Sequence, residues 1–154
     1  LIFKDLVFTE SRITQIHAQI AAQFPMDSTE LLKENMRKVI DQSLDVEMVT
    51  FLAKFMLNFA KFHPFQDGNK RTLLVIVDTF LRINNLKLHL KAQKEKETEE
   101  ELFFWQNSTQ QKKIEQIKTF LSQHMEKYTS TKDVEKEIAK SITQNKLLLE
   151  KLAR

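Results

Sequence analysis

The chain has 154 residues, of which 42% are apolar and 29% are charged, which is enough for one hydrophobic core in an ordinary globular domain. The single Gly and the two Pro disfavour sandwiches, barrels and glycine-rich nucleotide folds, because those folds need many tight turns. The absence of Cys excludes disulfides, thiolate zinc sites and a cysteine nucleophile, and we expect a cytoplasmic protein.

The charges of the chain nearly balance, with 24 Lys and Arg against 21 Asp and Glu, for a net charge of +3. Neither part of the chain carries more than a slight excess of basic side chains, which argues against a nucleic-acid partner. No apolar run reaches the roughly 18 residues of a membrane span, so we expect no membrane partner. Charged residues become denser after residue 90, which predicts a compact core over 1–90 and a charged helical extension over 91–154 that packs on it.

Helical spacing of apolar residues identifies the first elements of the chain. The isoleucines of residues 9–23 fall three and four apart, which predicts one buried helical face. Phe24 and Pro25 interrupt this helix. Asp27 is a candidate N-cap for a second helix that starts near Ser28.

Two stronger helices are predicted in the middle of the chain. Residues 46–62 carry phenylalanines at helical intervals, namely Phe51, Phe55 and Phe59. The run Leu73 to Val77 suits a buried strand as well as a helix. Because the apolar character continues to Ile83 without a turn signal, a central helix of about 15 residues is the better interpretation, ended by Asn84 and Asn85.

The remainder of the chain predicts charged and amphipathic helices. Residues 91–101 are either a linker or a solvated helix. Ser108 with Gln111 predicts a capped helix that runs to Tyr128. Residues 134–152 have helically spaced apolar side chains that pack on the core or join a second copy, so an oligomer through the C-terminal helices stays open.

The only Gly and one of the two Pro lie together in the loop 63–71, between the two strongest helices. Gly68 permits a positive φ, so that the amides of the loop and of the following helix can face one anion. Lys70 and Arg71 stand in the first helical turn, where they oppose the helix dipole, and this position favours contact with a phosphate group.

Other side chains of the loop suit the chemistry of a magnesium nucleotide. Asp67 supplies a carboxylate, and Mg²⁺ is normally held by one or two carboxylates together with phosphate oxygens and water. His63 can accept a proton from a hydroxyl near neutral pH, and Phe65 is expected to anchor the loop in the core. A simple turn between two helices is the alternative interpretation of the same residues.

The run HPFQDGNKR resembles the signature of the Fic/Doc family, commonly written HxFx(D/E)GN(G/K)R, at every specified position. The runs IHAQIAAQF at 16–24 and ELLKENM at 30–36 are similar to the death-on-curing branch, so that the resemblance covers roughly residues 10–90. It implies an all-α helical bundle with the motif loop between two central helices. It also implies a small β-hairpin flap, for which residues 24–30 are the candidate.

The resemblance implies an enzyme that uses ATP and Mg²⁺ to modify a Ser, Thr or Tyr hydroxyl of a target protein. His63 would deprotonate the hydroxyl and Asp67 would hold Mg²⁺. Phosphate would be bound by the remaining motif residues, Gly68, Asn69, Lys70 and Arg71.

Two products are compatible with the motif. Fic adenylyltransferases usually have Gly in place of Lys70 and a second Arg in place of Leu74, so both positions favour Doc-like transfer of the γ-phosphate. In contrast, Gly68 and the pair His63-Pro64 favour the Fic form. We expect AMP transfer, with Doc-like phosphorylation or an inactive binding or scaffold protein as alternatives. No inhibitory helix of the form (S/T)xxxE(G/N) is present, which implies a separate, antitoxin-like inhibitor or none.

Overall fold

Helices dominate the computed structural model of this protein, which describes residues 4–93 and 113–152. The first half contains α1 (Lys4–Val7), α2 (Glu10–Gln23), α3 (Lys33–Gln42), α4 (Met48–Phe62) and α5 (Asn69–Ile83). The second half contains β1 (Leu86–Leu88), the 3-10 turn η1 (Lys91–Gln93), α7 (Ile114–Gln123), β2 (Met125–Lys127), α8 (Val134–Gln144) and α9 (Lys146–Leu152). The predicted all-α bundle is confirmed.

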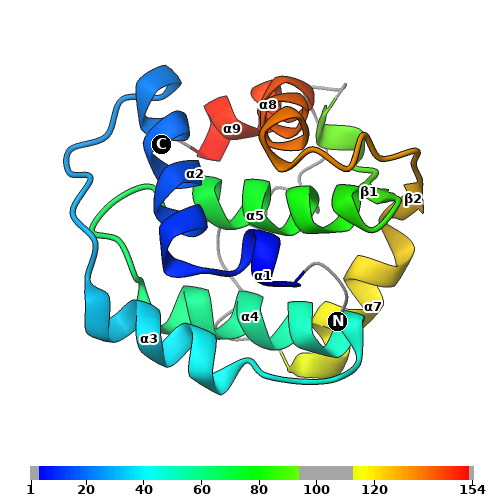
Figure 1. Ribbon diagram of the computed structural model, residues 1–154, viewed down its shortest axis with the longest axis horizontal. Coiled ribbons are helices and arrows are strands. Elements are labelled where there is room, and N and C mark those ends of the chain that lie inside the picture. The colour runs from blue at the N-terminus through cyan, green and yellow to red at the C-terminus, as the bar shows by residue number, and fades with distance from the viewer. Residues whose placement is uncertain (1–3, 94–112, 153–154) are drawn as a thin grey trace.

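Helix α5 forms the centre of the bundle, between α4 and α8 (Figure 1). Every side chain from Arg71 to Ile83 is buried, as expected for a helix that is covered on all faces. The run Leu73 to Val77 is therefore helical, as the length of its apolar stretch predicts. From α4, the rings of Phe51 and Phe55 each lie 4.7 Å from the ring of Phe8 and add an aromatic cluster to the core.

The second helix begins later than the sequence predicts. Helix α3 starts at Lys33 rather than near Ser28, and residues 24–32 are not helical. Leu31 forms an isolated antiparallel bridge with Phe65 of the motif loop. Asp27 does not cap a helix, because the N-cap residue of α3 is Leu32. The backbone N–H of Asp27 donates to the Asp67 carboxylate instead. Pairing with a distant loop has outweighed the local capping signal here.

The chain also forms a small antiparallel sheet that the sequence analysis did not predict. The helix expected to reach Tyr128 ends at Gln123, and the next residues pair with β1 in the register Leu86↔Lys127, Lys87↔Glu126 and Leu88↔Met125. This sheet lies apart from residues 24–30, where the flap was expected. The predicted cap at Ser108 and most of the 91–101 run lie outside the described residues.

A buried polar network joins the end of α5 to the C-terminal helices. Both carboxylate oxygens of Asp78 accept hydrogen bonds: Oδ1 from the Leu88 N–H at 3.0 Å, and Oδ2 from Arg82 at 2.9 Å, Ser141 at 2.7 Å and Asn145 at 3.0 Å. The four polar side chains of this network are fully or almost fully buried, namely Asp78, Arg82, Ser141 and Asn145. Ser141 and Asn145, which interrupt the apolar stripe in the sequence, are ligands of this carboxylate. The division of the chain at residue 90 stays a prediction.

None of the described helices has both the length and the apolar character that a membrane span requires.

Candidate functional site

The motif loop joins the C-terminal end of α4 to the N-terminal end of α5. Helix α4 ends at Phe62. The next residue, His63, has φ 48° and ψ 71°, which lie in the left-handed region and turn the chain out of the helix. Helix α5 begins after Gly68, which has φ 77° and ψ 17° and therefore also lies in the left-handed region. The two backbone reversals leave the side chain of His63 exposed at the rim of the loop.

Asn69 closes the loop on itself. Its side-chain Oδ1 accepts from the backbone N–H of Phe65 at 3.0 Å, and its Nδ2 donates to the Phe65 carbonyl at 2.6 Å. The ring of Phe65 is fully buried, so the loop is held from both sides. Because both ends of the Asn69 amide are engaged within the loop, the group that Asn69 offers to a phosphate is its backbone N–H.

The segment before α3 lies along the motif loop. The Leu32 N–H donates to the Pro64 carbonyl at 2.8 Å, and the Gln66 N–H donates to the Glu30 carbonyl at 3.2 Å. The side chain of Met26 fills the space beside Gly68, so close that a Cβ at Gly68 would lie 2.4 Å from the Met26 Cε. Residues 24–30, the candidate flap, therefore contact the motif loop, although they form no hairpin.

Asp67 is half-buried beside this segment, and its carboxylate is already oriented. Oδ1 accepts from the Gly68 N–H at 2.8 Å, and Oδ2 accepts from the Asp27 N–H at 2.8 Å. Each carboxylate oxygen has a further lone pair, so these bonds leave capacity for a cation. The described residues contain no group of three His, Asp or Glu that could enclose a metal. A single carboxylate fits Mg²⁺ that takes its other ligands from phosphate and water.

Arg71 supplies a buried positive charge to the same place. Its side chain is 3% exposed, its Nη1 donates to the Phe24 carbonyl at 3.2 Å, and its Nε has no partner among the described residues. Burial lowers the pKa of Arg71, whereas the Asp67 charge raises it. An unpartnered buried guanidinium N–H is costly without a ligand, and it fits an anion such as phosphate.

These groups line one depression of about 220 Å³. Its lining consists of His63, Gln66, Asp67, Gly68, Asn69, Lys70, Arg71 and Leu152. The N-terminus of α5 opens into it without a side-chain cap, so that the first amides of the helix and their partial positive charge face the space. The structure thus brings all the motif residues together except Pro64 and the anchor Phe65, which are both buried.

Two residues of the site carry no motif signal in the sequence. Leu152 reaches the depression from α9, at the far end of the chain from the loop. His17 of α2 is 1% exposed and stacks on Phe65, with ring centroids 3.8 Å apart and an interplanar angle of 3°. Burial lowers the pKa of His17, which keeps the ring neutral at neutral pH. Its place on the isoleucine stripe of residues 9–23 indicates burial but not the contact with the loop.

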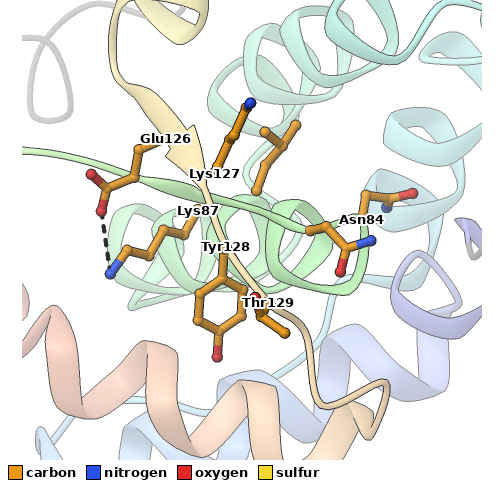
Figure 2. A pocket seen from close by; sticks show the side chains of 8 residues that line it. Asn84, Lys87, Glu126, Lys127, Tyr128 and Thr129 are labelled. Carbon is orange, nitrogen blue, oxygen red and sulfur yellow. Dashed lines mark ion pairs between the residues drawn. The ribbon is translucent and has the colours of Figure 1, made fainter.

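A more open depression of about 960 Å³ lies beside the β1–β2 pair (Figure 2). Two of its charged side chains, Lys87 and Glu126, pair with each other at 3.2 Å. The hydroxyl of Tyr128 is engaged with Glu137 at 2.7 Å, and burial together with that carboxylate raises the pKa of Tyr128. This depression therefore lacks the combination of a free base and a buried cation that the motif loop offers.

Comparison with known protein families finds a match over the first half of the chain. Residues 7–81 match the model of the Fic/DOC family, a segment that runs from α1 to near the end of α5 and includes the whole motif loop. No curated protein and no solved structure matches the chain. This match confirms the resemblance of residues 7–81 to the Fic/DOC family that the motif indicated.

Proposed function

We propose that this protein transfers AMP from Mg-ATP to a Ser, Thr or Tyr hydroxyl of a target protein. Members of the Fic/DOC family are generally transferases, and the family includes both proteins that transfer AMP and kinase-like Doc proteins. The observation that carries the proposal is the buried Arg71 with its unpartnered Nε, set beside the uncapped N-terminus of α5. A simple turn between two helices would not need a buried cation there.

His63 is the group of the depression that can accept the target's proton. It is exposed at the rim, where a hydroxyl of another protein can reach it, and a histidine imidazole is the commonest general base of enzymes. The hydroxyl oxygen forms a bond to the α-phosphorus as His63 takes its proton. The bond from the α-phosphorus to its leaving oxygen breaks, and pyrophosphate departs.

The rest of the loop binds and stabilises the charge of the phosphates. The backbone N–H of Asn69 and the cations of Lys70 and Arg71 act as positioned donors, and Gly68 supplies the left-handed turn that presents them. Asp67 would hold Mg²⁺, which when bound neutralises phosphate charge and orients the leaving group. A separate inhibitory protein is the kind of regulator that the absence of the inhibitory-helix pattern favours.

Transfer of the γ-phosphate is the second candidate. Fic adenylyltransferases usually have a second Arg where this chain has Leu74, and Leu74 is fully buried in the core, so that α5 offers no guanidinium to the phosphates from that position. The motif loop is the same for both reactions. They differ in which phosphorus lies next to His63.

The test uses α-labelled and γ-labelled ATP in parallel incubations with a cell lysate. Label on protein from α-labelled ATP is the expected result, and label from γ-labelled ATP alone would replace adenylylation by phosphorylation. His63→Ala should abolish labelling. His89→Ala is the matched control, because His89 is an exposed histidine that pairs with Glu126 at the sheet, outside the depression. Absence of labelling with either nucleotide contradicts both reactions and leaves the scaffold alternative.

A further inference from the structure

His17, a buried residue of α2, makes a hydrogen bond to the backbone of the motif loop. Its Nε2 lies 2.8 Å from the carbonyl oxygen of Asp67. A carbonyl oxygen only accepts, so Nε2 carries the hydrogen and donates. The stack on Phe65 fixes the plane of the imidazole ring and hence the direction of this N–H. The donor is buried and held by two independent contacts.

The bonded carbonyl belongs to the peptide unit that enters Gly68. A peptide unit is planar, so fixing the Asp67 carbonyl also fixes the direction of the Gly68 N–H. That N–H points to the Asp67 Oδ1 at 2.8 Å. The ring also limits the space at Gly68, since a Cβ there would lie 3.3 Å from the His17 Nε2. The His17 imidazole thus helps to fix both the Asp67–Gly68 peptide, which directly precedes α5, and the Asp67 carboxylate that this peptide's N–H contacts.

We propose that His17 is a positioning residue for phosphate binding, which holds the Asp67–Gly68 peptide so that the amides at the start of α5 and the Asp67 carboxylate face the depression. The inference rests on the proposed function, because it assumes that this depression binds a nucleotide. His17 itself touches neither the nucleotide nor the target. It acts through the loop, and it lies on α2, outside the nine-residue motif.

Two substitutions separate the hydrogen bond from the packing of the ring. His17→Gln keeps an N–H donor at the same number of bonds from the backbone. His17→Phe keeps an aromatic ring that can stack on Phe65 but removes the donor to the half-buried Asp67 carbonyl. Because this hydrogen bond holds the loop, we expect its loss in His17→Phe to weaken Mg-ATP binding roughly tenfold, with His17→Gln close to the unsubstituted protein.

The sequence offers a direct probe of the loop. Gly68 is the only glycine, so protein labelled with ¹⁵N-glycine gives one backbone amide signal in a two-dimensional NMR spectrum. We expect this signal to move in His17→Phe before any nucleotide is added, and to keep its position in His17→Gln. Titration with Mg-ATP should then shift it in the unsubstituted protein and in His17→Gln at similar concentrations, and in His17→Phe only at higher ones.

The outcomes that overturn the inference differ from those that overturn the proposed function. The inference fails if His17→Phe binds Mg-ATP as tightly as the unsubstituted protein does. It also fails if His17→Gln and His17→Phe lose affinity for Mg-ATP equally, because His17 would then only fill space. If Mg-ATP leaves the Gly68 signal of the unsubstituted protein unchanged, the proposed function fails. In that case, comparison of the Gly68 signals of the variants and the unsubstituted protein without nucleotide still decides whether the His17 hydrogen bond sets the loop geometry.

A last measurement covers the case in which His17→Phe does not fold, as judged by circular dichroism. ¹⁵N-histidine spectra of the unsubstituted protein report which ring nitrogen carries the hydrogen, with His17→Gln identifying the signal. The inference requires hydrogen on Nε2 of His17 at neutral pH. A neutral ring with hydrogen on Nδ1 would refute it.

Discussion

Substitution of Gly68 by Ala tests the geometry of the loop with a single methyl group. Gly68 has φ 77°, and an L-residue in the left-handed region is disfavoured by about 1–2 kcal/mol. The added Cβ would also lie 2.4 Å from the Cε and 2.6 Å from the Sδ of Met26. Both atoms are at the end of a flexible side chain, so Met26 can rotate away at a cost of about 1 kcal/mol. We therefore expect Gly68→Ala to lower the free energy of unfolding by about 2–3 kcal/mol.

A double-mutant cycle separates these two contributions. Met26→Ala removes both clashing atoms but leaves φ at Gly68 unchanged, so Gly68→Ala should cost only about 1–2 kcal/mol in that background. Urea unfolding followed by circular dichroism at 222 nm measures all four proteins. Equal costs in the two backgrounds would show that Met26 does not fill the space beside Gly68. A negligible cost in both would show that the left-handed turn is absent.

Three further predictions concern the polar network and the charged groups. Asp78→Ala removes the nearer of the two carboxylates that face the buried Arg82, so we expect a loss of about 3–5 kcal/mol in urea unfolding. A loss below about 1 kcal/mol would contradict the network. For Glu137, burial raises the pKa, but hydrogen bonds from Thr131 and Tyr128 and the Arg82 charge outweigh it, so the net pKa lies below the usual 4.5. The ionised Glu137 therefore stabilises the fold above pH 4.5, and this stabilisation is lost as the pH falls below that value. Glu137→Gln should flatten the dependence of the urea midpoint on pH in the acid range. An unchanged slope would contradict the role of the Glu137 carboxylate. Lys70 is exposed, so Lys70→Ala should change the free energy of unfolding by less than about 0.5 kcal/mol. It should weaken Mg-ATP binding and make the affinity less dependent on salt, as measured by calorimetric titration at two salt concentrations. Affinities equal to those of the unsubstituted protein would remove Lys70 from the site.

The sequence alone determined the class of the fold and the position of the candidate site. Apolar side chains at helical spacing are a local signal, and they identified the helices on either side of the loop. The loop was visible because Gly68 and Pro64 stand together in a chain that otherwise has one Pro and no other Gly. The residue types of the motif then indicated phosphate chemistry, because cations at a helix N-terminus are unfavourable without an anion.

Only the tertiary structure decided how the site is held. Extended pairing with the motif loop delays the start of α3 to Lys33, and His17 reaches the Asp67 carbonyl from a helix far away in the sequence. Leu152 closes one side of the depression from the C-terminal end of the described chain. Spacing along a chain reports which face of a helix is buried. It does not report which distant backbone group that face will meet, because that depends on how all the helices pack together.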